Sequence, residues 1–296
     1  MSHITVLKDE AVQMMSLRKG ATAVDATFGA GGHASLIVKA ITPAGTYVGI
    51  DLDGTAFASE AAKSLQTTPK VRVELVTDNF CHLDKVLSSL NIKKVDAVLA
   101  DLGWRSEQFE SGGKGLSFNK SEPLLMTLGD QADYLFTAAD IVNDWDEDDI
   151  ANVIYAYGEE TKARKIARAI VQSRQHKKFT NSLQLANCVS EAYPQRHQRI
   201  HPATKTFQAL RVAVNDELKS LETFLSLAAN SLKPGGRLVV ISFHSLEDRI
   251  VKHFFRECAQ TGAFSLITKR PVVPGESEVK LNPRARSAKL RCIEAK

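Results

Sequence analysis

The first hundred residues alternate between two patterns of apolar and polar positions. Short runs rich in valine, isoleucine and alanine have the length and composition of buried strands. These runs are residues 21–26, 46–51, 71–76 and 95–101. Between them, apolar residues recur at helical spacing, which predicts helices over 33–40, 56–65 and 84–90. Strands that alternate with helices in this way are typical of a parallel sheet covered on both faces.

The pattern changes near residue 130. No convincing strand is visible over residues 130–201. Five apolar residues from Ala163 to Val171 follow one face of a helix, and another helix is expected after Asn181, a residue type that favours helix N-termini. These features predict an inserted all-helical domain over residues 131–203.

Strand-like character returns afterwards. Apolar residues from Phe207 to Leu225 predict one long amphipathic helix, and Lys233-Pro-Gly-Gly236 is a strong signal for its end. Residues 237–243 then read as another strand. The predicted fold is therefore α/β, with a Rossmann-like sheet that is interrupted by the helical insertion. Its sheet domain is discontinuous and consists of residues 1–130 and 204–296.

Composition excludes several classes of protein. The chain has 296 residues, of which 44% are hydrophobic and 24% charged, so it is neither a disordered chain nor a collagen-like or coiled-coil rod. Its four cysteines are far apart and form no CxxC pair, which argues against a zinc ribbon and against a disulfide framework. We therefore expect no metal site.

The distribution of apolar residues also indicates where in the cell the protein is expected. No run approaches the roughly 18 apolar residues that a membrane span requires. Charged residues stand at Lys8, Asp9 and Glu10, where a signal peptide would be apolar. We expect no membrane association and a place in the reducing cytoplasm.

Positive charge gathers in two blocks although the net charge is only +4. Residues 161–178 hold seven Lys or Arg and no acid, and residues 280–296 hold six with one acid. Such blocks suit a polyanion-binding face, although a solvated helix face has the same composition. Arg164 and Arg168 in the first block, and Arg284 and Arg286 in the second, are candidate phosphate contacts.

A glycine-rich loop follows the first predicted strand. The sequence from Asp25 to His33 contains Gly29-Ala-Gly31-Gly32, and Asp51 ends the next strand 22 residues after Gly29. Glycines at such a turn let the backbone approach a ligand, and the helix N-terminus favours an anionic group. A carboxylate that ends the second strand can accept hydrogen bonds from both ribose hydroxyls of a nucleoside cofactor. A tight structural turn would also explain the glycines.

Two cofactors fit this layout. A dinucleotide site prefers GxGxxG, and the third glycine is missing here at that spacing. An acid before the loop, GxGG within it and an acid that ends strand two favour S-adenosylmethionine instead. Carboxylates nearby would suit its cationic sulfonium.

Further candidates end the third and fourth predicted strands. Phe80 follows strand three, where it could flank an adenine or simply belong to the core. Asp101 ends strand four at the carboxyl edge, where open α/β sheets carry out their chemistry, and Trp104 follows it. An amine methyltransferase needs a hydrogen-bond acceptor and a stacking aromatic at this place, and Asp101 and Trp104 could supply both. Alternatively, Asp101 only contacts the cofactor and Trp104 belongs to a lid.

Longer motifs run in order along the whole chain. They are His3-Ile-Thr-Val-Leu7, Asp25-Ala-Thr-Phe-Gly-Ala-Gly-Gly-His33, Asp101-Leu-Gly103, Tyr157-Gly-Glu-Glu160, His201-Pro-Ala-Thr-Lys-Thr-Phe-Gln-Ala-Leu-Arg211, Val214-Asn-Asp-Glu-Leu218, Ile241-Ser-Phe-His-Ser-Leu-Glu-Asp-Arg-Ile-Val251 and Asn282-Pro-Arg-Ala-Arg-Ser287. Together they closely resemble the RsmH (MraW) family. Members of that family methylate the N4 amine of a cytidine in the decoding centre of 16S rRNA, with S-adenosylmethionine as methyl donor.

The resemblance implies a site and a partner. Its cofactor contacts carry over to Gly31, Gly32, His33, Asp51, Phe80, Asp101 and Gln108. The helical insertion would recognise the substrate, and the implied partner is the small ribosomal subunit. His201 and His244 are weaker candidates for the RNA side, because a lone histidine is more often a satisfied structural residue. A homodimer is left open.

The chain departs from the family pattern in two places. Trp104-Arg-Ser106 stands where the family usually has Val-Ser-Ser, and two charged positions are lost in the segment from Glu122 to Asp130. Two alternatives therefore stay open beside the methyltransferase. One is a non-catalytic assembly factor that binds the small subunit, and the other is a nicotinamide-dependent oxidoreductase.

Overall fold

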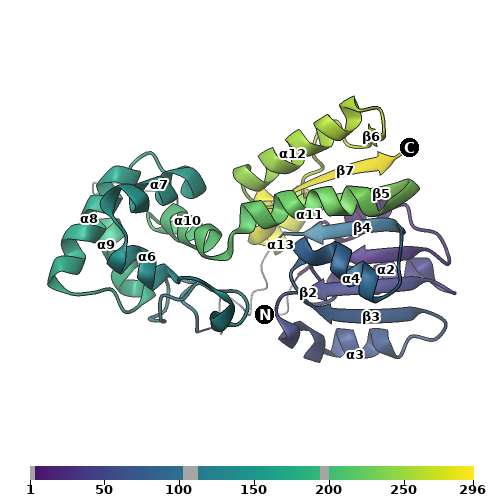
Figure 1. The fold of residues 1–296 in the computed structure, drawn as a ribbon, viewed down its shortest axis with the longest axis horizontal. Coiled ribbons are helices and arrows are strands. Elements are labelled where there is room, and N and C mark those ends of the chain that lie inside the picture. The colour runs from purple at the N-terminus through teal and green to yellow at the C-terminus, as the bar shows by residue number, and fades with distance from the viewer. Residues whose placement is uncertain (1–3, 103–112, 194–199) are drawn as a thin grey trace. The chain divides into compact units, whose positions relative to one another are not determined.

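The computed structural model describes residues 4–102, 113–193 and 200–296. The chain divides into two compact units (Figure 1). The sheet unit consists of Met1–Arg105 and Leu218–Lys296, and the helical unit is Ser106–Glu217. The insertion expected at 131–203 lies inside the helical unit, which also includes the segments on either side of it.

The sheet unit is built on seven strands. They are β1 (Thr22–Asp25), β2 (Thr46–Asp51), β3 (Arg72–Thr77), β4 (Val95–Asp101), β5 (Leu232–Ser242), β6 (Phe264–Leu266) and β7 (Lys289–Ala295). Their order is β3-β2-β1-β4-β5-β7-β6, in which β1 to β5 are parallel and β7 is antiparallel to both neighbours. The predicted α/β fold with a mostly parallel sheet is confirmed. The chain order reverses between β1 and β4, and such a switch point is where open α/β sheets bind ligands.

Helices cover both faces of this sheet. They are α1 (Lys8–Met14), α2 (Gly32–Ile41), α3 (Glu60–Gln66), α4 (Leu83–Ser89), α11 (Glu217–Ser231), α12 (Ser245–Gln260) and α13 (Glu276–Leu281), with short 3-10 turns η1 (Gly54–Ala58), η2 (Phe80–His82) and η4 (Pro283–Ser287). Successive strand residues face opposite cores. Ala23, Tyr47 and Leu99 pack with α1, α2 and α3, whereas Val24 and Val48 pack with α4, α11 and α12. The strands read as continuous apolar runs because both faces are buried.

Two expected elements differ from the structure in this unit. The helix expected over 56–65 is split into η1 and α3 at Ser59, whose side chain accepts a hydrogen bond from Ala62 N and so begins a new helix. The strand expected from 237 starts earlier, at Leu232. Lys233 to Gly236 form an irregularity within it, where Gly235 has φ 77°.

The helical unit contains the remaining elements. They are η3 (Gln131–Asp133), α6 (Ala138–Asp144), α7 (Glu147–Gly158), α8 (Ala163–His176), α9 (Ser182–Glu191) and α10 (Thr204–Asn215). No strand occurs in the described part of residues 130–201, as expected. The apolar stripe of α8 is buried, and Asn181 caps α9 by accepting a hydrogen bond from Gln184 N at 3.0 Å. Both helix predictions are confirmed.

The single helix expected from Phe207 to Leu225 is wrong. α10 ends at Asn215 and α11 begins at Glu217, because Asp216 between them has the left-handed values φ 46° and ψ 41°. A helix cannot continue through a residue in that conformation. Among the described residues, no helix is both long and apolar enough to cross a bilayer.

Candidate active site

The glycine loop lies at the switch point, where β1 ends. The chain leaves Asp25 and turns with positive φ at Gly29 (57°) and Gly31 (76°), and Gly31 is the N-cap of α2. A Cβ atom on Gly31 would lie 3.0 Å from both the Phe28 ring and Ala61, and one on Gly32 would collide with the Thr5 side chain. The loop therefore needs glycine for its backbone angles and for space.

Asp51 fixes this loop to the end of β2. Its carboxylate accepts hydrogen bonds from Gly29 N at 2.7 Å and from Asp53 N at 2.9 Å. These two amides hold the carboxylate in one orientation beside the glycine turn. The structure therefore places Asp51 and the glycine loop together, as the sequence pattern predicts.

Asp25 lies beneath the loop and is only 1% exposed. Tyr47 Oη donates to its carboxyl group at 3.1 Å. Burial, with a smaller contribution from the nearby carboxylates of Asp101 and Asp51, raises the pKa of Asp25 to about 8 despite that hydrogen bond. At neutral pH its carboxyl group is thus mainly neutral. It supports the loop from within the core and does not present a charge to a ligand.

Asp101 joins the site from the neighbouring strand. Its backbone N–H donates to Thr27 Oγ1 at 2.7 Å, which ties the end of β4 to the loop that follows β1. His33 of α2 lies beside Asp101 and is 4% exposed. Its Nδ1 is 3.9 Å from Asp101 Oδ2, and its Nε2 is 3.2 Å from the carbonyl oxygen of Val6.

Three contributors to this site were missed by sequence reasoning. Thr27 stands inside the quoted loop motif and could have been found there. Val6 belongs to the first motif, but nothing in its residue type indicates that its carbonyl would meet a histidine. Tyr47 sits in the middle of an apolar strand, where an aromatic residue gives no sign of a polar partner.

Phe80 stands at the start of η2, after β3. It is half-buried, and its ring meets Phe224 of α11 edge to face with centroids 5.1 Å apart. Asn79 holds this turn by accepting a hydrogen bond from Cys81 N at 3.0 Å. The ring is therefore fixed at the carboxyl edge of the sheet. Trp104 and Gln108, the other two predicted residues near this edge, lie outside the described residues.

The candidate RNA-side residues are spread over both units. In the sheet unit, His244 caps α12: its Nδ1 accepts from Glu247 N at 3.4 Å, and Glu247 accepts in turn from His244 N at 3.2 Å. The helix end thus accounts for the Nδ1 atom and the backbone N–H of His244. Arg284 and Arg286 are exposed in η4. In the helical unit, His201 is exposed and stacks on Phe118.

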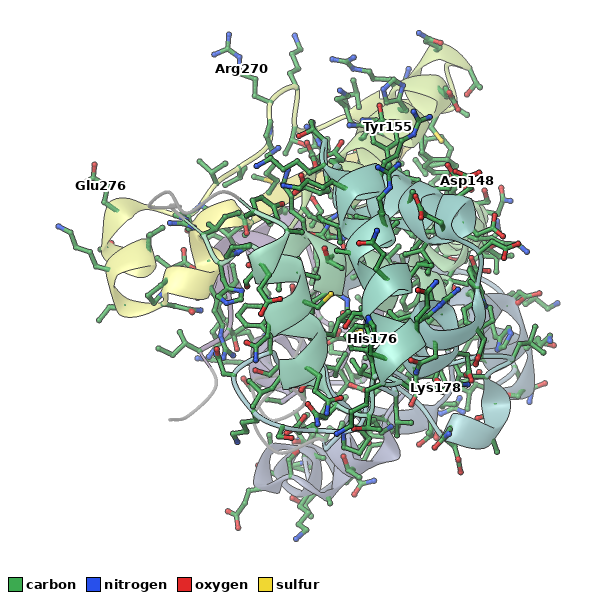
Figure 2. All side chains as sticks on the ribbon, turned by 90° about the vertical axis from the view of Figure 1, so that its left-hand side faces the viewer. Asp148, Tyr155, His176, Lys178, Arg270 and Glu276 are labelled. Carbon is green, nitrogen blue, oxygen red and sulfur yellow. The ribbon has the colours of Figure 1, made fainter. Side chains whose placement is uncertain are left out.

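Arg164 and Arg168 extend from the exposed side of α8. Together with Lys165, His176, Lys177 and Lys178 they form what we call the α8 basic face, and all six are exposed. Figure 2 shows the end of this face, where His176 and Lys178 are labelled. Two of the cations meet acids: Arg168 lies 3.4 Å from Glu147, and Lys178 lies 2.9 Å from Asp144. Exposed pairs of this kind contribute little, so the face keeps its positive character.

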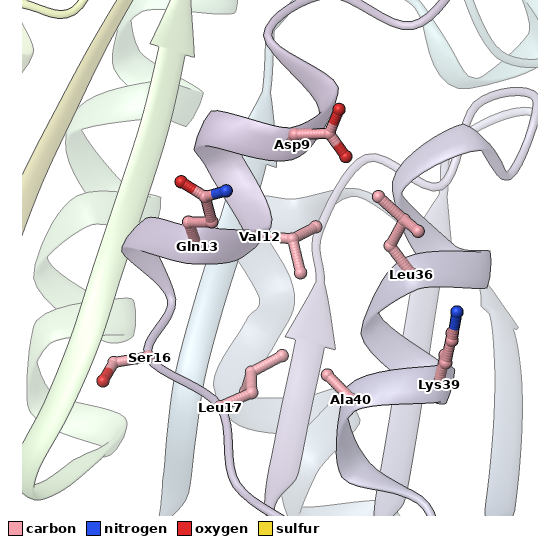
Figure 3. Close-up of a pocket in the computed structure, with 8 residues that line it drawn as sticks. All are labelled: Asp9, Val12, Gln13, Ser16, Leu17, Leu36, Lys39 and Ala40. Carbon is pink, nitrogen blue, oxygen red and sulfur yellow. The ribbon is translucent and has the colours of Figure 1, made fainter.

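A separate open groove of about 500 Å³ runs between α1 and α2 (Figure 3). Its apolar floor includes Val12, Leu17 and Leu36, and Asp9 and Lys39 stand at its rim. None of the candidate site residues lines it. The groove therefore lies apart from the switch point.

The fold and the carboxyl-edge acids define an α/β protein with a nucleoside-cofactor site. The profile of the MraW methylase family matches residues 1–296, and the chain belongs to that family. A relative named ribosomal RNA small subunit methyltransferase H from Bradyrhizobium diazoefficiens is 46% identical, with 99% of this chain and 91% of the relative covered. A relative of the same name from Brevibacillus brevis is 41% identical, with 99% and 97% covered.

Two solved structures are similar to this chain over almost its whole length. A putative rRNA-methylase from Clostridium thermocellum has a TM-score of 0.49 and 15% identity, and the match covers 100% of both chains. A putative methyltransferase from Streptococcus mutans in complex with SAH has a TM-score of 0.49 and 13% identity, with 99% and 100% covered.

The protein is a methyltransferase, and S-adenosylmethionine is its methyl donor. The described residues fit this donor. The glycine turn exposes backbone with positive φ at Gly29 and Gly31 at the N-terminus of α2, and Asp51 is held beside that turn by two backbone amides. The family does not favour a nicotinamide-dependent oxidoreductase.

Proposed function

We propose that the protein methylates the N4 amine of a cytidine in the decoding centre of 16S rRNA, and that its partner is the small ribosomal subunit in the cytoplasm. The observation that carries this proposal is the meeting of the glycine loop, Asp51 and Asp101 at one switch point of the sheet. The names of the relatives supply the substrate class. A homodimer stays a prediction.

The residues on the cofactor side have separate roles in this proposal. S-adenosylmethionine, when bound, supplies the methyl group on a cationic sulfonium. Gly31 and Gly32 let the backbone come close to the donor, and Asp51 accepts hydrogen bonds from its ribose hydroxyls. Phe80 flanks the adenine. His33 lies on the buried side of the site, with its Nδ1 3.9 Å from Asp101 Oδ2 and its Nε2 held at 3.2 Å from the carbonyl oxygen of Val6.

Asp101 has the central role on the substrate side. A cytosine N4 amine is a poor nucleophile because its lone pair is conjugated with the ring. Asp101 accepts a hydrogen bond from this amine, which aligns the nitrogen and stabilises the positive charge that develops there. Its position is fixed by the 2.7 Å hydrogen bond from its own N–H to Thr27 Oγ1. Trp104 is proposed as the stacking wall and Gln108 as a further cofactor contact.

The helical unit is proposed to bind the RNA backbone. Its α8 basic face, with Arg164 and Arg168, offers exposed basic side chains along α8 and on the two residues that follow this helix. Phosphate contacts of this kind position a protein on nucleic acid without reading its sequence. Arg284 and Arg286 of the sheet unit are proposed as further phosphate contacts.

Transfer of a labelled methyl group tests the proposal. Small subunits from a strain without the endogenous enzyme are incubated with the protein and tritiated S-adenosylmethionine, and mass spectrometry identifies the modified nucleoside. We expect N4-methylcytidine from the wild type and a loss of at least 100-fold, on the order of what a lost transition-state hydrogen bond removes, for Asp101→Ala, which has no side-chain acceptor. Asp84→Ala is the matched control, because Asp84 is exposed in α4.

Each alternative has its own outcome in this experiment. Binding to small subunits without any methyl transfer by the wild type would identify a non-catalytic assembly factor instead. Heat of binding with a nicotinamide dinucleotide and none with S-adenosylmethionine would identify an oxidoreductase.

A further inference from the structure

Three aromatic rings form a stack in the helical unit. Phe207 of α10 is buried and meets the half-buried Phe118 edge to face, with centroids 5.4 Å apart and planes at 84°. On Phe118 lies the ring of His201, nearly parallel at 15° and with centroids 4.4 Å apart. We call these three residues the aromatic stack. It rises from the core of the unit and ends in an exposed ring.

The last ring is fixed in place although it is exposed. Ala203 N donates to His201 Nδ1 at 3.2 Å, and Thr204 N donates to the His201 carbonyl at 3.0 Å, so the residue is built into the start of α10. With Nδ1 as acceptor, the neutral ring carries its proton on Nε2. Phe118 covers one face of the ring, and His201 as a whole is exposed.

The segments that carry this ring are positively charged. Residues 113–120 and 200–205 contain Lys114, Lys120 and Lys205 and no acid. Lys114 Nζ donates to Gly129 O at 2.6 Å, and Lys205 Nζ donates to Glu159 O at 2.8 Å. Both of these acceptors are backbone carbonyls, which leave the lysine charges in place. The surroundings of the stack therefore offer three lysines to the phosphates of a polyanion, although the carboxylate of Glu122 also lies there and accepts from Gly115 N at 3.1 Å.

We propose that the uncovered face of His201 is a stacking platform for an unpaired base of the RNA substrate. A preoriented aromatic ring beside cations is how proteins hold a base that has left its helix. Because Phe118 packs against the His201 ring and Phe207 packs against Phe118, the His201 ring keeps its orientation when no base is bound. This inference rests on the proposed function, because it assigns one contact of the same RNA.

Two substitutions separate stacking from a structural role at the helix start. His201→Asn keeps a side-chain oxygen that can accept from Ala203 N but has no ring. His201→Phe keeps the ring but has no acceptor. The matched control is His253→Asn, which makes the same change at an exposed position of α12 in the sheet unit. Urea unfolding followed by circular dichroism, which responds to the helices of the helical unit, checks that all variants remain folded.

The experiment measures binding of RNA to each variant. It also measures KM and kcat for small subunits separately. An RNA hairpin from the decoding centre, with 2-aminopurine in its loop, reports stacking through quenching of fluorescence. Loss of one base–aromatic contact lowers affinity about 5- to 150-fold. We expect this loss and a matching rise in KM for subunits with His201→Asn, little change in kcat, and near wild-type values for His201→Phe and His253→Asn.

The possible results lead to different conclusions. Equal binding by all variants would overturn the platform and leave the proposed function intact. Weaker binding by His201→Phe together with near wild-type binding by His201→Asn would show that the acceptor at the start of α10 matters and not the ring, which also overturns the platform. Failure of the wild type to bind either the hairpin or small subunits would overturn the proposed function, and the platform with it.

Discussion

Replacing Asp25 with asparagine should flatten the pH dependence of folding stability. In the native protein the pKa of Asp25 is raised to about 8 from the ordinary 3.8, chiefly because its carboxyl group is buried. Between these values the native state holds a proton that the unfolded state has released. The free energy of unfolding therefore falls as pH rises, by up to about 1.4 kcal/mol per pH unit.

The size of the effect can be worked out for an accessible range. From pH 5 to pH 7 the contribution of Asp25 to the free energy of unfolding should decrease by about 2.5 kcal/mol. Asparagine has nearly the same shape and can still accept the hydrogen bond from Tyr47. Asp25→Asn should thus resemble the wild type at pH 5 and lose less stability on the way to pH 7.

Urea unfolding, followed by circular dichroism at several pH values, measures this difference. Because other groups titrate over the same range, the quantity to compare is the difference in the free energy of unfolding between wild type and Asp25→Asn at each pH. Asp84→Asn, at an exposed position, should give a curve parallel to the wild type. Parallel curves for wild type and Asp25→Asn as well would refute the assignment of a neutral, buried carboxyl group beneath the glycine loop.

Substitutions at three further positions test individual features of the structure. Lys70 has φ 64° in an exposed turn, so Lys70→Gly should be about 1–2 kcal/mol more stable to urea than Lys70→Val, and equal stability would contradict the assigned backbone. Asn181→Ala should lower the free energy of unfolding by about 1 kcal/mol and Asn181→Ser should restore most of it, unless the cap of α9 is unimportant. Arg291→Met should lower thermal and urea stability by about 2 kcal/mol, because it removes the 2.7 Å hydrogen bond to the buried Asp248 and leaves Lys289, at 3.1 Å, as its cationic partner. No change in stability there would mean that Lys289 is sufficient for Asp248.

Much of the fold could be predicted from local patterns. The strands β2 and β4 have the bounds expected from their apolar runs, and α8 and α9 lie where the helical period and Asn181 place them. These elements are strongly periodic over their whole length. Period and capping residues are local properties, so a sequence carries them directly.

The positions where helices are interrupted, and the hydrogen bonds between residues far apart in the chain, could not be predicted from local patterns. Asp216 interrupts a continuous apolar stripe, and its neighbour Asn215 donates to Met126 O, a residue 89 positions away. For the site, the sequence predicted that Asp51 lies beside the glycine loop. It also grouped Asp25 with the charged carboxylates near the ligand. Its burial under the loop depends on Tyr47 and on the packing of the whole sheet. Such contacts are set by tertiary structure, which overrides local preference.

The parallel pairing of β4 with β5 has a consequence for biosynthesis. β4 ends at Asp101 and β5 begins at Leu232, so about 130 residues must be translated before the central strand meets its partner. At roughly 5–20 residues per second this delay lasts about 7–26 s. During that time the edge of β4 has no partner from β5, and an unpaired edge can add strands from another nascent chain. The helices encoded in between are contiguous and rich in local contacts, so they can fold first and separate neighbouring chains on a polysome.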